Sequence, residues 1–405
     1  MANILGIIAE YNPFHNGHSY HIKKAKELAK ADYIVVIMTG NFTQRGNTSI
    51  INKWEKAKIA LENEVDMVIE LPTVYATSSA ENFASGAIKI FKELGFITHI
   101  SFGMEEKSLE ELNNIAEVLV KEPRNYVISL KTELEKGVSY PKAREQALVK
   151  YFNDKKYEEI INQPNNILAI EYLKAMRIYK LDAKTIGIKR EKVDYNSKSV
   201  VDEYASATAI RHLLLSNNFE KISKTVPKST MRVLTENVKN DTRVLDLTEF
   251  EKMIVYKIRL MSIKEIYNIP DVTEGLENAI KTAASKTNNI LELIELVKSK
   301  RYTQTRIQRN LVYILLGITK KDIEMSKKVF PYIRILGVTK NGKKLLSYIK
   351  SKNIISSVKS FEEINVNRNY KRMLEIDKIA TDIYTIAYKN NSKSNLDYTN
   401  RLIVI

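Results

Sequence analysis

Two histidines flank a glycine in residues 9–18, Ala-Glu-Tyr-Asn-Pro-Phe-His-Asn-Gly-His. Imidazole N–H groups donate hydrogen bonds to phosphate oxygens, and glycine lets a backbone lie close to a ligand. A helix beginning here adds free backbone N–H groups that attract anions. His15, Gly17 and His18 are therefore typical of a polyphosphate site. The spacing is also typical of a plain turn with two surface histidines, and it is the predicted strand before it and helix after it that favour the polyphosphate site.

A second polar segment, residues 206–211, reads Ser-Ala-Thr-Ala-Ile-Arg at a predicted helix start. There the hydroxyls of Ser206 and Thr208 and the guanidinium of Arg211 can hold the outer phosphates of the same nucleotide. An ordinary helix cap has the same composition. The two segments together indicate a nucleotide site more specifically than either does alone.

The elements that must position these segments are short β-branched runs alternating with amphipathic stretches. The runs predict strands at residues 4–9, 33–38, 67–71 and 98–102. The stretches between them predict helices at residues 19–31, 53–63 and 81–94. This alternation predicts an α/β fold, a Rossmann-like doubly wound parallel sheet, in which ligands bind at the carboxyl ends of the strands. Residues 9–18 directly follow the first of these strands.

Helical patterns dominate the rest of the chain. Helices are predicted at residues 109–121, 126–136, 141–151 and 166–179, before a returning strand at 185–189 and a helix near residue 206. Later segments with helical spacing are residues 291–300, 305–316 and 341–350, with a short strand at 333–338. We therefore expect two domains, residues 1–212 with the sheet and residues 213–405 mostly α-helical.

The net charge of +16 belongs almost entirely to the second half of the chain. Residues 1–200 hold 28 Lys+Arg against 26 Asp+Glu, whereas residues 201–405 hold 36 against 22. Residues 301–350 alone hold 12 basic and 2 acidic residues. Such a density is typical of a surface that binds a polyanion such as RNA. The alternative is a solvated, lysine-rich surface.

Composition excludes several other classes of protein. The chain has no cysteine, so it forms no disulfide, no thiolate metal site and no thioester, and any acyl transfer must proceed without a protein sulfur. Its start lacks the features of a signal peptide, and nothing approaches the length of a membrane helix. We expect a cytoplasmic protein with no membrane partner.

The residues that match a known family extend well beyond the two polar segments. Residues 15–18 and 206–211 resemble the HxGH and SSTxIR-type signatures of the adenylyl-transferring nucleotidyltransferase superfamily, except that Ala207 stands where a second hydroxyl is common. The chain is similar to the tRNA(Met) cytidine acetate ligases in residues 6–20, 39–46, 101–103, 165–172 and 188–190, and more weakly in 305–309.

This resemblance implies that ATP and acetate form acetyl-adenylate with release of pyrophosphate. The acetyl group then passes to the exocyclic amine of the wobble cytidine of elongator tRNA(Met), giving N4-acetylcytidine. Residues 1–212 would be the nucleotidyltransferase-like, ATP-binding catalytic domain, and residues 213–405 the basic tRNA-binding domain. Mg²⁺ is expected to enter with ATP, and no metal site of the protein's own is predicted. The sequence indicates no oligomeric state.

The resemblance also assigns roles to residues. His15 and His18 are the expected catalytic groups, which neutralise triphosphate charge in the transition state. The expected ATP-binding residues are Ile7, Ile8, Ala9, Glu10, Tyr11, Asn12, Pro13, Phe14, His15, Asn16, Gly17, His18, Ser19, Tyr20, Gly103, Asn165, Arg190, Ser206, Thr208 and Arg211. Asn165 is an equally good cap for the helix that follows it.

Asn41, Gln44 and Arg45 follow the second strand, on the same sheet edge as the histidines. They are candidates for an acetate or cytidine pocket, and the alternative is a loop packed by its own polar groups. Glu10 is a candidate for holding magnesium or orienting a histidine, although a single carboxylate is not a metal site. His21 is expected on the outer surface of its helix.

On the RNA side, Arg306 and Arg309 share a helix face and are the expected tRNA-binding residues. Nearby in sequence are Lys320, Lys321, Lys327, Lys328, Lys343 and Lys344. Tyrosines interleave with these cations, and the choice for each lies between stacking on bases and packing in the core: Tyr302, Tyr313, Tyr332 and Tyr348.

Two other functions fit parts of this pattern. A small-molecule adenylyltransferase of coenzyme biosynthesis would use the same phosphate site, but it has no use for a basic second half. A non-catalytic RNA-binding protein with a nucleotide-sensing domain would use that half, but it has no need of intact His15, Gly17 and His18.

Overall fold

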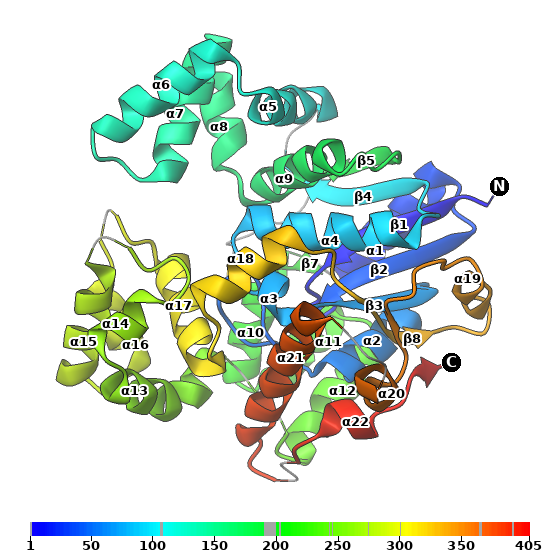
Figure 1. The fold of residues 1–405 in the computed structure, drawn as a ribbon. Helices are drawn as coiled ribbons and strands as arrows, with labels where there is room; N and C mark the ends of the chain where they lie inside the picture. The colour runs from blue at the N-terminus through cyan, green and yellow to red at the C-terminus, as the bar shows by residue number, and fades with distance from the viewer. Residues whose placement is uncertain are drawn as a thin grey trace.

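The computed structural model describes residues 2–105, 108–189, 200–201, 204–242, 244, 246–273, 275–299, 301–363, 367–390 and 393–405. One sheet organises the molecule, with strand order β10-β8-β3-β2-β1-β4-β5, and β9 pairs with β8 (Figure 1). Its strands are β1 (Ile4–Ala9), β2 (Tyr33–Thr39), β3 (Met67–Leu71), β4 (His99–Met104), β5 (Lys184–Lys189), β8 (Ile333–Val338), β9 (Ile354–Ile355) and β10 (Ile403–Val404). The short pair β6 (Val200–Val201) and β7 (Tyr204–Ala205) lies apart from it.

The strands β1 to β5 are mutually parallel. Their side chains alternate between two buried clusters, so that Val35 and Ile37 face one layer of helices while Ile34 and Val36 face the other. This period of two, on strands covered on both faces, explains their continuous apolar runs. The doubly wound α/β fold predicted from the sequence is confirmed, and so are the strands at 4–9 and 67–71.

Helices cover both faces of the sheet. One layer includes α1 (Asn16–Ala29), α2 (Lys53–Leu61), α10 (Ala207–Leu215), α11 (Phe219–Thr225) and α12 (Lys228–Lys239). The other includes α3 (Thr73–Ala76), α4 (Ala80–Leu94), α5 (Leu109–Lys121) and α9 (Pro164–Ile178). Between α5 and α9 the chain forms an excursion of α6 (Arg124–Glu135), α7 (Tyr140–Phe152) and α8 (Lys156–Asn162).

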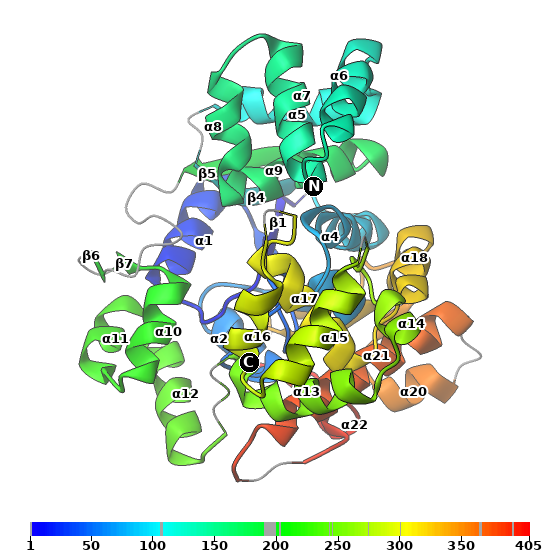
Figure 2. The ribbon, with the colours of Figure 1, turned by 90° about the vertical axis from the view of Figure 1, so that its left-hand side faces the viewer.

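A helical group follows α12 and projects from the same side of the molecule as the α6–α8 excursion (Figure 2). It consists of η1 (Leu247–Phe250), α13 (Glu251–Leu260), α14 (Ile263–Tyr267), α15 (Leu276–Lys286), α16 (Ile290–Val297) and α17 (Gln304–Leu316). The chain then continues through α18 (Lys320–Lys328), α19 (Lys343–Leu346), α20 (Val358–Glu363), α21 (Arg368–Ile386) and α22 (Leu396–Thr399).

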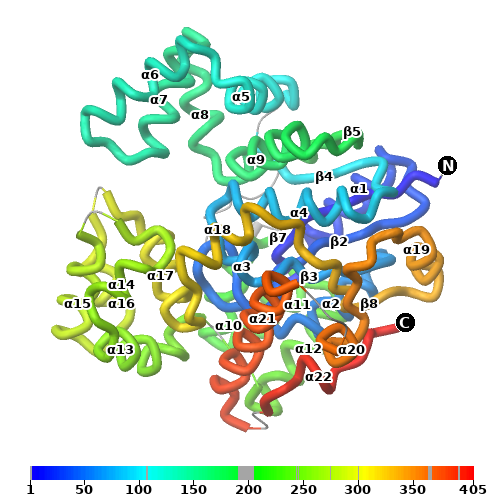
Figure 3. Tube along the Cα trace, viewed as in Figure 1, coloured from blue at the N-terminus to red at the C-terminus, as the bar shows by residue number. Residues whose placement is uncertain are grey.

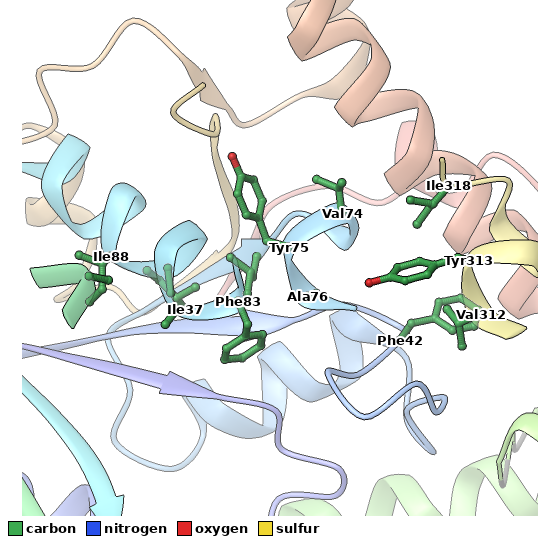
Figure 4. Close-up of a cluster of buried hydrophobic side chains, with 14 of the residues drawn as sticks. Ile37, Phe42, Val74, Tyr75, Ala76, Phe83, Ile88, Val312, Tyr313 and Ile318 are labelled. Atoms are coloured by element: carbon green, nitrogen blue, oxygen red, sulfur yellow. The ribbon is translucent and has the colours of Figure 1, made fainter. Parts of the chain in front are cut away.

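The core of this helical group is continuous with that of the sheet. Figure 4 shows Tyr313 and Val312 of α17 beside Phe42 and Ala76, which follow β2 and β3. The Tyr313 hydroxyl donates to the carbonyl oxygen of Thr77 at 2.8 Å. The position of α17 is therefore fixed by apolar burial against the carboxyl edge of the sheet.

Three strands from beyond residue 212, β8, β9 and β10, complete the sheet. β8 pairs antiparallel with β3, as Val68 opposite Gly337 illustrates, and β10 pairs with β8. Residues on both sides of the expected domain boundary thus form a single sheet. Because β8 runs against its neighbour, the chain after it emerges at the amino edge of the parallel strands. The tube in Figure 3 shows α19 at the right, on the same side as the N-terminus, and α17 at the left.

A buried ionic cluster holds the last segment of the chain. Asp397 of α22 accepts hydrogen bonds from Lys53 at 2.7 Å and Arg334 at 2.5 Å, and Glu70 pairs with the same two cations at 3.0 and 3.2 Å. Burial by itself would raise the pKa of Asp397, but the two cations hold it below its usual range. The cluster ties α22 to α2, β3 and β8.

Candidate active site

A cavity of about 300 Å³ lies at the carboxyl ends of the parallel strands. Of the expected site residues, the structure brings together Ile7, Ile8, Ala9, Glu10, Tyr11, Asn12, His15, Gly17, His18, Tyr20, Gln44, Arg45, Gly103, Asn165, Ser206, Thr208 and Arg211. Pro13, Phe14, Asn16, Ser19 and Asn41 do not line the cavity, and Arg190 lies outside the described residues. The two polar segments singled out in the sequence meet here: residues 9–18 follow β1 at this edge, and residues 206–211 follow the separate strand β7 and begin α10.

The two histidines are held by the start of α1. His15 is its N-cap, and its Nδ1 accepts from the Gly17 N–H at 3.1 Å. His18 Nδ1 accepts from the His15 N–H at 3.2 Å, which completes a reciprocal capping box. The two rings stack with centroids 3.7 Å apart. Local helix capping therefore fixes both imidazoles side by side.

This capping also assigns the proton on each ring. Because Nδ1 of both His15 and His18 accepts a hydrogen bond, the proton of each neutral imidazole sits on Nε2. The pair is thus built from hydrogen-bond donors with a common orientation, which is the property a phosphate-binding site requires.

Gly17 has a packing role beyond the one that its position in the sequence predicts. A Cβ at this position would lie 2.9 Å from Cε1 of the His15 ring, closer than side-chain contacts allow. The sequence predicts that this glycine permits the approach of a ligand. The structure shows that it first permits the ring of its own N-cap residue to fold over the helix start.

The loop between β1 and α1 is fixed from outside as well. The Asn12 side chain donates to the Thr48 carbonyl and accepts from the Ile50 N–H, both at 2.9 Å. Arg211 of α10 donates to the Asn12 carbonyl at 3.0 Å and to the Thr208 hydroxyl at 3.1 Å. The second polar segment therefore braces the first directly.

Ser206 begins α10 as its N-cap and accepts from the Ala209 N–H at 3.0 Å. The capping interpretation of this segment is confirmed, and it is compatible with phosphate binding because Ser206, Ala207 and Thr208 also line the cavity. The helix N-terminus itself is directed at the site, which favours an anionic ligand there.

The residues of the loop after β2 have two kinds of role: some stabilise the fold and others line the cavity. Asn41 is buried and its side-chain oxygen accepts from the Lys53 N–H at 2.9 Å, so it organises the start of α2. Gln44 and Arg45 line the cavity, and the Gln44 amide donates to the Ser78 carbonyl at 3.0 Å. The geometry thus places only two of the three expected pocket residues at the cavity.

Lys56 joins the residues at the ends of β1 and β2. Its buried Nζ donates to the carbonyl oxygens of Glu10, Thr39 and Gly40 at 3.0, 2.9 and 2.8 Å, and to the Ser49 hydroxyl at 2.9 Å. Burial lowers the pKa of this ammonium group to about 7, against the opposing effect of Glu10. The three donors of this ammonium group are shared among these oxygens, which hold the two loops in register.

Asn165 is not the helix cap that one interpretation favoured. Helix α9 begins earlier, at Pro164, with Gln163 as N-cap. The Asn165 side chain instead donates to Glu105 Oε1 at 2.7 Å, and its N–H donates to Oε2 at 3.1 Å. It lines the cavity together with Gly103, near the end of β4.

Several residues that line the cavity are not predicted from the sequence. They are His21, Phe83, Leu168, Tyr172, Ile188, Lys189, Ala205 and Ala207. The expectation that His21 lies on the outer surface of α1 is wrong, because His21 lines the cavity and its Nε2 lies 2.8 Å from the hydroxyl of buried Ser101 on β4. Its spacing of one helical turn from His18 was the signal that could have found it. Phe83 and Tyr172 gave no such signal, since α4 and α9 reach the cavity only through tertiary packing.

The two arginines expected to bind tRNA both contact the loop of residues 268–273, which contains Asp271. Arg306 donates to the Asp271 carbonyl at 2.9 and 2.7 Å and to the Thr273 hydroxyl at 2.8 Å. Arg309 pairs with the Asp271 carboxylate at 3.2 Å and is 14% exposed. Of the interleaved tyrosines, Tyr313 and Tyr332 are buried in the core, which decides their role as packing.

Within the described ranges, no three His, Asp or Glu side chains gather as a metal site would require. Nor does any described helix combine the length and apolar character needed to cross a membrane.

Comparison with known proteins identifies relatives over the whole chain. The family described as HIGH Nucleotidyl Transferase matches residues 2–399. The tRNA(Met) cytidine acetate ligase of Thermoanaerobacter sp. (strain X514) is 44% identical over 99% of both chains. That of Acetivibrio thermocellus is 41% identical over 99% of this chain and all of its own.

Solved structures agree. Thermotoga maritima TmcAL in its apo form is 31% identical, with a TM-score of 0.96 over 100% of this chain and 99% of that one. The same protein bound with alpha-thio ATP gives a TM-score of 0.94 over the same shares. The chain therefore belongs to the HIGH nucleotidyl transferases and, within them, to the tRNA(Met) cytidine acetate ligase family.

Proposed function

We propose that this protein is an ATP-dependent ligase that activates acetate as acetyl-adenylate and acetylates the wobble cytidine of elongator tRNA(Met). The observation that carries the proposal is the pair of stacked imidazoles at the strand ends, which line one cavity together with the first residues of α10. Relatives over the whole chain are named for this reaction, and a solved relative is described as bound with an ATP analogue.

In the first step, a carboxylate oxygen of acetate attacks the α-phosphorus of ATP, and pyrophosphate leaves with the electron pair of the broken P–O bond. We assign His15, His18 and Arg211 to the phosphate charge that develops in this step, because all three line the cavity and carry donors. The remaining contribution is positioning, supplied by loops that Lys56 and Asn12 hold in place. The expected ATP contact of Arg190 stays a prediction.

The residues that line the cavity indicate how Mg²⁺ would bind together with ATP. Glu10 is a lone carboxylate in the cavity, and no cluster of three metal ligands exists among the described residues. Mg²⁺ therefore fits as an ion carried by the triphosphate, where it would neutralise phosphate charge.

In the second step, the acetyl group moves directly from the adenylate to the cytidine amine. A mixed anhydride with AMP is already an activated acyl donor, so the chain needs no thiol, and it contains no cysteine. We assign binding of the tRNA to the basic second half, including Arg306 and Arg309. A cytoplasmic location belongs to the same proposal, because that is where tRNA and ATP meet.

The test is to incubate the protein with ATP, labelled acetate and total tRNA, and then to digest the RNA to nucleosides. Label in N4-acetylcytidine from a single tRNA species is the expected result. Unlabelled RNA, with pyrophosphate release driven by another small molecule, would identify a coenzyme adenylyltransferase instead. RNA binding without any ATP turnover would identify a non-catalytic protein.

A further inference from the structure

Among the described residues, one acidic side chain lines the cavity, that of Glu10. Its negative charge repels the ligands assigned to the first step. Glu10 stands among the basic or imidazole groups of His15, His18, His21, Arg45, Lys189 and Arg211. ATP and acetate are both anions, so a carboxylate here weakens their binding. Its presence calls for a ligand that is a hydrogen-bond donor.

The Glu10 side chain is held in place by a hydrogen bond to one of its two carboxylate oxygens. Its Oε1 accepts from the Gln44 N–H at 2.8 Å, and its carbonyl oxygen accepts from buried Lys56. Within the described part of the chain, Oε2 accepts no hydrogen bond. Tyr172 lies close by, since the charge of Glu10 adds to burial in raising the pKa of that hydroxyl. The carboxylate therefore presents one fixed acceptor oxygen at the cavity.

The two other roles considered for Glu10 find no support in this geometry. Among the described residues, it has no second and third carboxylate or imidazole arranged with it as a metal site. His15 and His18 take their orientation from the backbone N–H groups of Gly17 and His15, not from Glu10. The acceptor oxygen remains to be explained by a substrate.

We propose that Glu10 binds the exocyclic amine of the acceptor cytidine and takes its proton as the acetyl group is transferred. This inference rests on the proposed function, in which that amine is the one N–H nucleophile that enters the cavity. Glu10 would then be a catalytic residue of the second step.

In this step the amine nitrogen forms a bond to the acetyl carbon, and the bond from that carbon to the phosphate oxygen of AMP breaks, leaving its electron pair on AMP. The proton lost by the nitrogen passes to Glu10 Oε2 and then to water. A base is needed because the nitrogen lone pair is delocalised into the ring and becomes nucleophilic only as the proton leaves.

The experiment compares two rates in Glu10→Gln, which keeps the shape of the side chain and an oxygen for the Gln44 N–H. One rate is acetate-dependent exchange of pyrophosphate into ATP, which reports the first step. The other is single-turnover transfer of labelled acetyl from preformed adenylate to tRNA. We expect transfer to fall about 100-fold or more relative to exchange, the contribution typical of a positioned base.

A second acetyl acceptor, hydroxylamine, distinguishes loss of the base from misfolding of the variant. Hydroxylamine attacks acetyl-adenylate without help from a protein base, so Glu10→Gln should still form acetohydroxamate from ATP and acetate. Glu10→Asp, which keeps the carboxylate but withdraws it, should lie between wild type and Gln in transfer. The matched control is Glu81→Gln, because Glu81 is 61% exposed, pairs with Lys174 and does not line the cavity.

The outcomes decide between explanations. Equal loss of exchange and transfer in Glu10→Gln would overturn the inference, because Glu10 would then act on ATP. So would transfer at the wild-type rate. Failure of the proposed function would be seen separately, because the wild-type protein would then show no acetate-dependent exchange of pyrophosphate into ATP.

Discussion

The carboxyl edge and the amino edge of the sheet both carry basic residues from the same stretch of sequence. The two edges differ in their acidic residues and in the segments that pack there. At the carboxyl edge, residues 301–328 hold seven Lys or Arg and two acidic residues, and α17 and α18 pack on the segments that follow β2 and β3. At the amino edge, residues 340–350 hold four Lys and no acidic residue, and the Thr339 N–H donates to the carbonyl of Asp66, just before β3.

A single topological feature produces this difference. β8 runs antiparallel to β3, so the segment before it lies at the edge with the cavity and the segment after it lies at the opposite edge. Lys343 and Lys344 are near Arg306 and Arg309 in the sequence. In the structure the two pairs lie at opposite edges of the sheet. Charge density along a chain therefore indicates a polyanion surface only after the topology is known.

The largest expected effect contrasts a histidine at each edge. His18→Ala should lower acetate-dependent pyrophosphate exchange about 100- to 1000-fold, as loss of a transition-state hydrogen-bond donor does. Binding of tRNA should change far less, because the substitution removes no surface cation. His99→Ala, at the amino start of β4, is the matched control and should leave exchange near wild type. Similar losses in both variants would contradict the assignment of chemistry to one edge.

The next effect tests the two basic regions with equal charge changes. The triple variant Lys321→Glu, Lys327→Glu and Lys328→Glu should weaken tRNA binding about tenfold or more and reduce its salt dependence. The control triple is Lys340→Glu, Lys343→Glu and Lys344→Glu. All six lysines are exposed, so folding should be affected equally. Filter binding at several salt concentrations measures both properties, and equal weakening by the two triples would show that the edges do not differ.

A smaller effect distinguishes the two roles of the arginines on α17. Arg306→Ala with Arg309→Ala, and separately Asp271→Ala, should each destabilise the protein by about 1–3 kcal/mol, since each removes hydrogen bonds between α17 and the loop of residues 268–273. If the arginines also bind tRNA, only the double arginine variant should weaken tRNA binding. Urea unfolding and filter binding on both proteins decide this. Equal tRNA affinity in the two would leave the arginines a structural role alone.

The smallest effect concerns the attachment of α18. Buried Lys89 donates to the carbonyls of Ser326, Lys327 and Val329, and burial lowers its pKa to about 8. Between about pH 8 and the usual lysine value near 10.5, the unfolded chain binds a proton that the folded protein does not. The free energy of unfolding should therefore rise with pH in this window, by at most about 1.4 kcal/mol per pH unit.

The variant Lys89→Met isolates that contribution. Its free energy of unfolding, measured in urea between pH 8 and 10, should rise less steeply with pH than that of wild type. A steeper rise in the variant would contradict a lowered pKa for Lys89 in the folded protein.

The sequence alone determined the parallel part of the sheet, the two polar segments that meet at the cavity, and the family. Residues that cap helix starts act through local hydrogen bonds, as the capping of α1 by His15 and of α10 by Ser206 shows. The strands at 4–9 and 67–71 were predicted to the residue because both faces of the parallel sheet are covered, which makes their apolar runs continuous.

Tertiary structure decided which residues share a site. Tyr172 and Phe83 reach the cavity, and Asn41 leaves it, through the packing of α9, α4 and α2 on the sheet. The role of Gly17, the partners of Arg306 and the separation of the two basic regions likewise depend on side-chain packing and on contacts between residues distant in sequence. Such contacts are set by apolar burial and strand order, which no spacing along the chain records.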